Sequence, residues 1–554
     1  SLVNYLVSQS GFKEDGIRSL ILNHESGFSP DEARVLSGLL SGIKACDPAC
    51  GSGAFLVGML NEIVNARRAL DPGGSEYLLK KETIQGCIYG VDIDPGAVEI
   101  AKLRLWLSLV VDYELADIEP LPNLDYKIMC GNSLLEELIV GGESIPLFDP
   151  KVLEKGRPKR KSSDKLMQMD FLKQDAEEYL KLLCKLHREY FHETDTQRKK
   201  AVRGRIEKIE MDFIQSSIDS RVKEIETQVK NLNMQKPEDR KKQVTLLSKK
   251  LEFLKIPREI HQSKARPYFL WHLNFFEVFP EKGGFDITIG NPPYVRADVD
   301  VEHAKMRRSI LDGGQYETLW EKWDLYVAFI ERAYKLLRPG GVTTLIVSDA
   351  FCHSKYAQKP QKWYLKNARI LRLDFCGDLK IFEAAVHNLI YFFQRADGAH
   401  NVPDRCVHRE IFGNVIMMPS DEQAKLTYRA FFPEDAAAQS FTCKSVKLDA
   451  VCYVTIGMVV NAHEDLAQGA FTMDDLVQDT RDSTHPKRFV EGKHLGMWLP
   501  ATHRWLEWGT ARAPALFRRP TFPEIYEADE KILVQRSPGP DPKCCYDDKH
   551  LHFT

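Results

Sequence analysis

The chain has 554 residues, a 43% hydrophobic content and a formal net charge of −3. This length allows two to four domains with sizeable cores. No apolar run of about 18 residues predicts a membrane span, and the first residues do not resemble a secretion signal. The twelve cysteines follow no metal-ligand spacing, so we expect reduced thiols in a soluble cytoplasmic protein that binds no metal. The acidic balance excludes a generally basic surface, so any contact with nucleic acid must come from local patches.

Residues 1–39 have apolar positions at helical spacing, and residues 43–56 then read as a strand, a glycine turn and a helix start. The turn is Asp-Pro-Ala-Cys-Gly-Ser-Gly, residues 47–53. Its small residues let a ligand approach the backbone, and the helix start offers free N–H groups. The carboxylate of Asp47 disfavours a pyrophosphate and suits a cationic ligand with an amino-acid end. The string resembles the first S-adenosylmethionine-binding motif of amino-methyltransferases, which implies cofactor contacts from Asp47, Ala49, Gly51 and Gly53.

Two further strand ends extend this cofactor prediction. Residues 88–95 repeat the strand-then-acid pattern, and an acid at the second strand of a doubly wound fold binds a ribose diol. Asp92 is therefore the expected ribose ligand, Ile93 an apolar floor for the adenine, and Asp94 a helix cap. Asn132, with Ser133 beside it, matches the position where the family binds the adenine amino group. The family often has Asp there, but the amide oxygen of Asn132 can accept the same bond.

Residues 151–265 are charged and contain few residues that favour strands. Apolar residues at 218–232 and 244–254 follow coiled-coil spacing on either side of Pro237, which predicts two helices folded into a hairpin. With basic runs at 157–161 and 198–200, this helical insertion fits an arm that contacts DNA or a partner. A solvated helical appendage explains the same pattern.

The next segment, Gly284 to Tyr294, reads as a buried strand that runs into Asn291-Pro292-Pro293-Tyr294. Two prolines fix the backbone and remove two donors. An amide side chain, carbonyl oxygens and a tyrosine ring remain to hold a flat group that carries an NH2.

The remainder of this region alternates strands and helices. A helix from Trp323 is expected to stop at residues 337–341, Leu-Arg-Pro-Gly-Gly, before a strand at 342–347, and the last two strands are expected to form an antiparallel hairpin at the edge. The sequence thus predicts an α/β fold with a doubly wound Rossmann-like sheet. We assign residues 1–150 and 266–435 to this methyltransferase domain and 151–265 to the insertion.

Residues 436–554 lose that alternation, and we expect them to form an α+β target-recognition domain that is incomplete here. Tryptophans and arginines that suit phosphate and base-edge contacts interleave at positions Trp498, Arg504, Trp505, Trp508, Arg512, Arg518, Arg519 and Arg536. A β-rich domain with ordinary packed tryptophans is the alternative.

The order of these motifs resembles the gamma class of DNA amino-methyltransferases and is similar to the methyltransferase part of type IIG restriction-modification enzymes and related phage-defence methylases. The resemblance covers residues 1–395 and implies S-adenosylmethionine as cofactor and double-stranded DNA as partner. An Asn at position 291 favours N6 of adenine over N4 of cytosine. The expected catalytic residues are Asn291, Pro292, Pro293 and Tyr294.

The chemistry follows from what an adenine amino group needs. If the Asn291 amide oxygen and the Pro292 carbonyl accept its two hydrogens, the nitrogen lone pair is freed toward the sulfonium methyl, and aligned acceptors supply the catalysis without a metal. The base must leave the duplex. Tyr294 offers a stacking face and, by resemblance, Phe382 offers a second contact. A core aromatic is the alternative for Phe382.

Three rival functions share parts of this pattern. A protein-glutamine methyltransferase has the same tetrapeptide but needs neither the insertion nor the tail. A non-catalytic DNA-specificity module would have a broken motif, and this one is intact. A nuclease domain or subunit outside this chain fits the class, but no Pro-Asp and Glu-x-Lys set lies on the predicted strands, so we expect no cleavage by this chain.

Overall fold

The structure is a computed structural model in which the chain divides into two compact units, Ser1–Gln439 and Ser440–Thr554. In the first unit it describes residues 1–73, 75–111, 122–140, 143–146, 181–231, 267–295, 301–376, 387–396, 405–410 and 415–419. In the second it describes 452–453, 455, 457–458, 473–498, 502–510, 513, 523–535 and 543–553. No helix within these ranges combines the length and the apolar character needed to cross a membrane.

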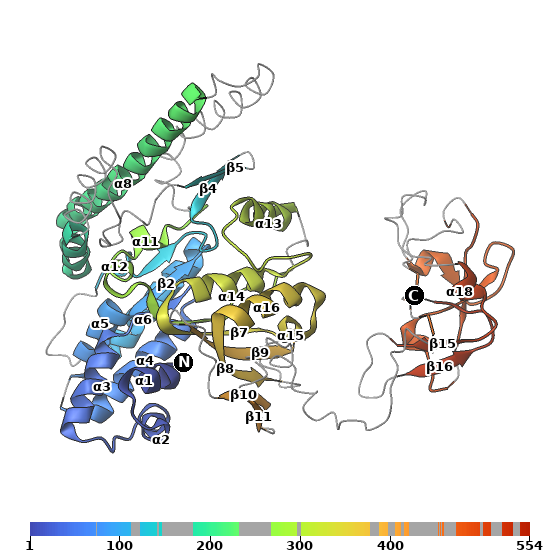
Figure 1. Cartoon of the computed structure of the whole chain (residues 1–554), viewed down its shortest axis with the longest axis horizontal. Coiled ribbons are helices and arrows are strands. Elements are labelled where there is room, and N and C mark those ends of the chain that lie inside the picture. The colour runs from blue at the N-terminus through green and yellow to red at the C-terminus, as the bar shows by residue number, and fades with distance from the viewer. Residues whose placement is uncertain are drawn as a thin grey trace. The chain divides into compact units, whose positions relative to one another are not determined.

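Among the described residues of the first unit, nine strands form one sheet (Figure 1). In spatial order they are β11 (Val415–Pro419), β10 (Arg405–Glu410), β8 (Ala368–Phe375), β9 (Asn388–Arg395), β7 (Leu337–Ser348), β6 (Phe285–Gly290), β1 (Ala45–Asp47), β2 (Ile88–Asp92) and β3 (Ile128–Cys130). From β7 to β3 the neighbours are parallel. The chain order reverses at β1, which lies between β2 and β6. In doubly wound sheets ligands bind at such a switch point, beyond the carboxyl ends of the strands.

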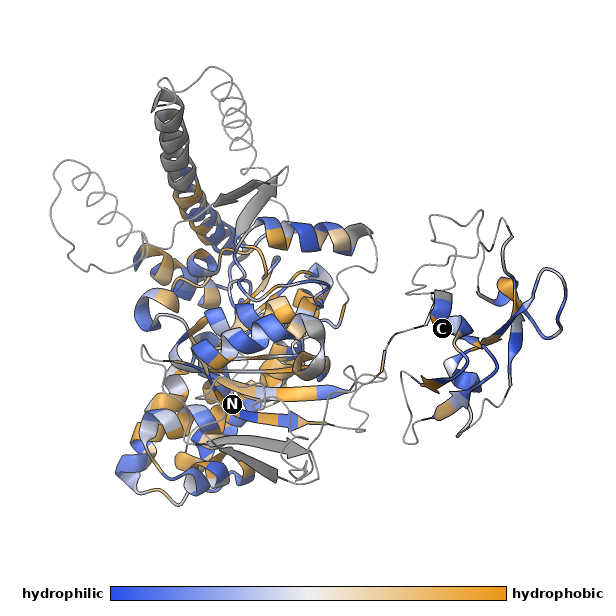
Figure 2. Cartoon of the chain, turned by 45° about the vertical axis from the view of Figure 1, so that its right-hand side comes forward, coloured by the Kyte–Doolittle hydropathy of each residue, from blue (hydrophilic) through white to orange (hydrophobic). Residues whose placement is uncertain are grey.

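Alternating residues of the strands pack into helices on the two faces of the sheet. Ile88 lies in a core with the N-terminal helices, whereas Tyr89 and Val91 lie in a core with Trp271 and Phe275. The helices on the Ile88 side are α1 (Leu2–Ser10), α2 (Glu14–Arg18), the π-helix η1 (Ser19–Asn23), α3 (Pro30–Gly42), α4 (Ala54–Leu70), α5 (Glu76–Cys87) and α6 (Pro95–Val110). Figure 2 shows hydrophobic residues on several strands and mixed hydropathy on the helices around them. The predicted doubly wound α/β fold is confirmed by this arrangement.

Further helices of the first unit lie shortly before β6 in the sequence or after it. They are α11 (Trp271–Asn274), α12 (Phe279–Lys282), α13 (Val301–Asp312), α14 (Leu325–Lys335), α15 (Ala350–His353), the 3-10 helix η4 (Lys355–Ala357) and α16 (Gln358–Asn367). Helices α14 and α16 contribute Phe329, Ile330 and Tyr364 to a core with Leu345 and Leu389 of the sheet. The helices thus pack against β7 and β9, two strands that follow the tetrapeptide in the sequence.

The predicted insertion is described over residues 181–231. Residues 181–192 are helical, and α8 (Thr196–Asn231) is the long green helix of Figure 1. Leu186, Ile206 and Ile209 pack on Phe276, which joins the start of the insertion to the aromatic residues before β6. A small hairpin of β4 (Glu137–Val140) and β5 (Glu143–Pro146) follows β3. The first predicted coiled-coil helix falls within α8, and the second, residues 244–254, lies outside the described residues.

The helix ends within two residues of the predicted stop at Leu337-Arg338-Pro339-Gly340-Gly341, but the predicted start of the next strand at residue 342 is wrong. Helix α14 already ends at Lys335, and these five residues open β7. The pairing of β6 with β7 jumps from Phe285 opposite Leu337 to Ile287 opposite Val342. Because proline has no N–H to give to a ladder, the extra residues form an irregularity instead of regular pairs.

The antiparallel hairpin of β8 and β9 is present, but its predicted edge position is wrong. Strand β9 lies between β7 and β8 and is antiparallel to both. The edge beyond β8 pairs with β10 in parallel, and β10 pairs with β11. Short local patterns could not show this pairing, because the partner strands are distant in sequence.

In the second unit, four of the described strands form a sheet, in the order β12 (Val477–Gln478), β14 (Arg504–Leu506), β13 (Lys487–Val490) and β17 (His552–Phe553). A separate hairpin pairs β15 (Lys531–Val534) with β16 (Cys544–Asp547). The short helices are η8 (Met473–Leu476), η9 (Gly492–His494) and α18 (Pro523–Glu527). Leu476, Phe489, Leu506 and Tyr526 form the core of this unit.

Candidate functional site

The predicted cofactor turn closes between the ends of β1 and β2. Gly51 N–H donates to Asp92 Oδ2 at 2.7 Å, and Cys50 N–H donates to the Val91 carbonyl at 3.0 Å. Gly53 caps α4 with a left-handed φ of 80°, and a Cβ there would lie 2.9 Å from the Cβ of Ala101. Only glycine therefore fits where α4 crosses α6. The structure brings the turn and the acid of the second strand together.

Asp47 is buried at the carboxyl end of β1. Its Oδ1 accepts a hydrogen bond from Ala49 N–H at 2.9 Å, and its Oδ2 is buried and has no partner among the described residues. Burial, opposed by the hydrogen bond from Ala49 and reinforced by the charge of Asp92, raises the pKa of Asp47 to about 8. A buried carboxyl oxygen of this kind is suited to a cationic or hydrogen-donating group of a ligand.

The side chain of Asp92 also organises the backbone around it. Its Oδ1 accepts from Asp94 N–H at 3.0 Å, in addition to the bond of its Oδ2 with Gly51. Asp94 caps α6 through Gly96 N–H at 2.8 Å, which confirms its predicted role. Ile93 is 51% exposed despite being apolar. An apolar side chain at this strand end leaves a surface that a flat ring could cover.

Asn132 and Ser133 follow the next parallel strand. Asp92 is in register with Cys130, so the two residues lie just beyond the neighbouring strand end. Both are buried, and Asn132 Oδ1 accepts from Leu134 N–H at 3.1 Å. The oxygen therefore already stabilises its own turn, although a carboxamide oxygen can accept a second bond.

An ion pair between the buried Arg332 and the partly buried Glu136, which the sequence did not reveal, fixes the loop after Asn132. Arg332 of α14 donates to Glu136 Oε2 at 2.8 Å and to the Leu134 carbonyl at 3.2 Å. Burial alone would raise the pKa of Glu136, but the Arg332 guanidinium outweighs it and lowers the pKa to about 2. The pair ties the predicted adenine-binding loop to the helix that follows the tetrapeptide.

The tetrapeptide begins where β6 meets β1. A Cβ on Gly290 would lie 2.4 Å from Asp47 Oδ1, so the two strand ends touch through glycine backbone. The next residue, Asn291, has a buried Oδ1 with no hydrogen-bond partner among the described residues. Pro292 is buried and Pro293 exposed. The acceptor Asn291 Oδ1 therefore belongs to the residue that directly follows Gly290, the glycine in contact with the Asp47 carboxyl.

Tyr294 is half-buried and fixed at its hydroxyl. The hydroxyl donates to the Ile346 carbonyl of β7 at 2.8 Å and accepts from Asn388 Nδ2 at 3.2 Å. Burial raises the pKa of Tyr294, so the hydroxyl stays protonated as a donor. Sequence reasoning missed Asn388, and the only signal was a polar residue at the start of an apolar strand.

Some predicted site residues lie outside the described part of the chain. These are Phe382 and the arginines Arg512, Arg518, Arg519 and Arg536. In the second unit Trp498 is 77% exposed, whereas Trp508 packs beside the core and its ring lies 5.0 Å from that of His552. No cluster of three potential metal ligands occurs within the described ranges.

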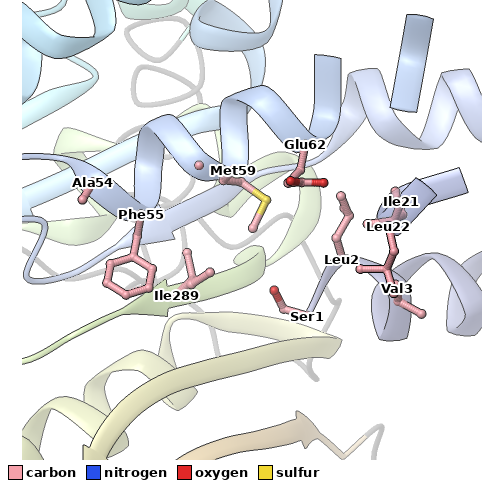
Figure 3. A pocket seen from close by; sticks show the side chains of 11 residues that line it. Ser1, Leu2, Val3, Ile21, Leu22, Ala54, Phe55, Met59, Glu62 and Ile289 are labelled. Atoms are coloured by element: carbon pink, nitrogen blue, oxygen red, sulfur yellow. The ribbon is translucent and has the colours of Figure 1, made fainter. Parts of the chain in front are cut away.

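A pocket of about 460 Å³ lies beside the tetrapeptide strand (Figure 3). Phe55, Met59 and Glu62 project into it from successive turns of α4, opposite Ile289 of β6. None of the predicted cofactor ligands lines this pocket. The pocket therefore lies between α4, which begins at the glycine turn, and β6, which ends at Gly290 just before Asn291.

Comparisons with known proteins agree with this geometry. Residues 86–382, more than half of the chain, match the family described as "Eco57I restriction-modification methylase". A putative type II restriction enzyme and methyltransferase of Methanocaldococcus jannaschii is 29% identical over 365 residues, which are 60% of this chain and 28% of that protein. The type II methyltransferase M.BstVI of Geobacillus stearothermophilus is 33% identical over 161 residues, 28% of this chain and 26% of that protein.

Among solved structures, the type IIL restriction-modification enzyme MmeI in complex with DNA aligns over 100% of this chain and 61% of that chain, with 12% identity and a TM-score of 0.46. The chain spans less than a third of the length of the two curated relatives. On the match over residues 86–382, the chain belongs to the Eco57I restriction-modification methylase family.

Proposed function

We propose that this chain transfers a methyl group from S-adenosylmethionine to N6 of an adenine flipped out of duplex DNA. The observation that carries the proposal is the buried Oδ1 of Asn291, which has no partner among the described residues and directly follows Gly290, the glycine in close contact with Asp47. The M. jannaschii and G. stearothermophilus relatives are named as methyltransferases of type II systems. An orphaned acceptor in a buried site is costly unless a ligand donates to it.

The residues at the sheet's switch point fit the cofactor. Asp47 offers an unpartnered carboxyl oxygen to a cationic amino-acid end, and Asp92 lies beside the glycine turn for a ribose. Ile93 offers apolar surface to the adenine ring, and Asn132 with Ser133 lies beyond the adjacent strand. Ala49, Gly51 and Gly53 complete the turn. When bound, S-adenosylmethionine supplies an electrophilic methyl group on a sulfonium sulfur.

In the proposed reaction the protein holds the amino group and does no covalent chemistry. Asn291 Oδ1 and the Pro292 carbonyl accept its two hydrogens and free the nitrogen lone pair. The lone pair would bond to the methyl carbon while sulfur keeps the electrons of the carbon–sulfur bond as a neutral thioether, and the surplus amino proton would pass to solvent water. Pro293 stiffens the loop, and Tyr294 with Phe382 holds the extruded base, since base stacking on an aromatic ring is worth about 1–3 kcal/mol.

The remaining assignments rest on the sequence patterns of these segments. We assign residues 151–265 to an arm and 436–554 to target recognition, and we place the activity in restriction-modification or phage defence, with any nuclease outside this chain. Protein-glutamine methylation fits the tetrapeptide, but the matched family is one of restriction-modification methylases.

A methyl-transfer assay tests the proposal directly. The chain is incubated with labelled S-adenosylmethionine and mixed-sequence duplex DNA, and the digested DNA is analysed for N6-methyladenine and N4-methylcytosine. Asn291→Ala should abolish incorporation while cofactor affinity, measured by calorimetry, is retained. Asn61→Ala, an exposed asparagine of α4, is the matched control and should leave the rate unchanged. Label in protein but not in DNA, or full activity of Asn291→Ala, would contradict the proposal.

A further inference from the structure

The outer face of the small sheet in the second unit carries an aromatic residue between polar neighbours. Trp505 of β14 lies opposite Arg488 of β13 and Gln478 of β12. The adjacent residues Leu506 and Phe489 are buried in the core of the unit. Because side chains alternate along a strand, Trp505, Arg488 and Gln478 share the face turned away from that core.

Two guanidinium groups lie over this one indole. Arg481 Cζ is 5.3 Å and Arg488 Cζ 5.8 Å from the ring centroid of Trp505, and the His503 ring lies edge-on at 5.6 Å. Arg488 also donates to the Lys549 carbonyl, at 3.4 Å. The ring attracts both cations and holds them near one another.

Arg481, Arg488 and Lys549 differ from several other cations of the same unit in having no acidic partner among the described residues. Within the described part of the chain, Arg481, Arg488 and Lys549 form no ion pair, and Asp482, next to Arg481 in sequence, is held by Gln478 and Thr484. By contrast, carboxylates pair with Lys487, Lys493, Arg504 and Lys531.

The local electrostatics agree with an uncompensated positive face. Partial burial lowers the pKa of His503, and the positive charges of Arg488 and Lys549 lower it further. The two guanidinium groups over Trp505 repel each other, and an anion bound between them would offset this repulsion. The whole chain has a net charge of −3, so this positive face is a local feature.

We propose that the face formed by Arg481, Arg488, His503, Trp505 and Lys549 binds the phosphate backbone of the DNA substrate. Arg481 and Arg488 contact phosphates, and Trp505 keeps their guanidinium groups in place. Contacts of this kind position a protein on the duplex and carry no sequence information. The identity of the partner as DNA rests on the proposed function. In this proposal the face holds the DNA backbone, and other residues read the target sequence.

Lys493 of η9 provides a control within the same unit. It is an exposed cation like Arg481 and Arg488, but Glu491 pairs with it at 3.1 Å. Its removal therefore takes away a positive charge that already has an acidic partner. Substitution of both Arg481 and Arg488 by Lys keeps their charge and serves as the conservative variant.

The test measures the affinity of the full chain for a mixed-sequence duplex as a function of chloride concentration. Arg481→Ala/Arg488→Ala should flatten the slope of log K against log salt by about 1.8, since each phosphate contact contributes about 0.9. The double lysine variant should retain most of the slope, and Lys493→Ala should retain all of it. Thermal unfolding of each variant checks that the unit remains folded.

Two results would overturn the inference: an unchanged slope in the folded double alanine variant, or an equal loss of slope in Lys493→Ala. The methyl-transfer assay separates this outcome from the proposed function. If the chain methylates DNA and the slope is unchanged, only the inference fails. If the double alanine variant loses slope but the wild-type chain methylates no DNA, only the proposed function fails.

Discussion

The side-chain amide of Asn388 donates a hydrogen bond to the hydroxyl of Tyr294, over 3.2 Å. The same hydroxyl donates to the Ile346 carbonyl, so β9 and β7 both fix the last residue of the tetrapeptide. Asn388 is 2% exposed. It is a positioning residue that acts through Tyr294.

Loss of the hydrogen bond between Asn388 and Tyr294 should lower kcat without weakening cofactor binding. Asn388→Ala should reduce kcat about five- to tenfold, because one net hydrogen bond contributes about 1 kcal/mol, while the calorimetric Kd of S-adenosylmethionine stays constant. Tyr294→Phe removes the other partner. If the two residues act together, the double variant should be no slower than the slower single variant, and fully additive losses would refute the coupling.

The contact between Gly290 and Asp47 predicts a large effect from one methyl group. Gly290→Ala places a Cβ 2.4 Å from Asp47 Oδ1, so the strand ends must separate. We expect the free energy of unfolding to fall by about 1–3 kcal/mol and cofactor affinity to fall with it. The control is Gly38→Ala in α3, where a Cβ meets nothing within 4 Å and should stabilise the helix by about 0.5–1 kcal/mol. Urea unfolding measures both, and equal effects would contradict the close approach.

The raised pKa of Asp47 predicts that cofactor binding releases a proton. With a pKa of about 8, the carboxyl of the free protein is protonated at neutral pH, whereas a cationic ligand favours its ionised form. Affinity should rise with pH and level off above about 8. Calorimetry in two buffers of different ionisation enthalpy counts the proton. Asp47→Asn should remove the pH dependence, and a constant affinity of the wild type between pH 6 and 8 would exclude the linkage.

The raised pKa of Asp47 should also affect the stability of the cofactor-free chain. This stability should fall as pH rises, whereas cofactor affinity should increase. Between the ordinary pKa of 3.8 and about 8, the folded state holds a proton that the unfolded state has lost. Asp47 therefore destabilises the free protein increasingly as pH rises through this range. A melting temperature of Asp47→Asn that exceeds the wild-type value more at pH 8 than at pH 5 would agree with this sign.

The pair of Glu136 and the buried Arg332 should contribute to acid stability. The pKa of Glu136 falls from 4.5 to about 2 in the folded protein, so its contribution is complete above pH 4.5 and is lost as pH falls toward 2. Glu136→Gln leaves the buried guanidinium with less compensation, and we expect a loss of about 3 kcal/mol at pH 7. Glu207→Gln breaks an exposed pair with Arg203 and should cost less than about 0.5 kcal/mol. Similar losses in urea unfolding would refute the role of burial.

Local patterns predicted several elements well. The glycine turn, the Asp94 cap and the strand before Asn291 depend on neighbours along the chain, and the structure has each of them. The strand start at residue 342 and the edge position of the last hairpin were wrong, because strand pairing at Leu337 and Asn388 depends on distant partners. Phe382 and the cofactor roles stay predictions.

By itself, the sequence determined the residue types and their order: an acid before glycines, a second acid after a strand, and an amide before two prolines. These are local features, because turn conformation and side-chain chemistry are encoded within a few residues. Only the tertiary structure decided that Gly290 touches Asp47, that Asn388 holds Tyr294, and that Arg481 and Arg488 share Trp505 without a carboxylate. Such contacts join residues far apart in sequence, and they form only when strand order and register bring those residues together.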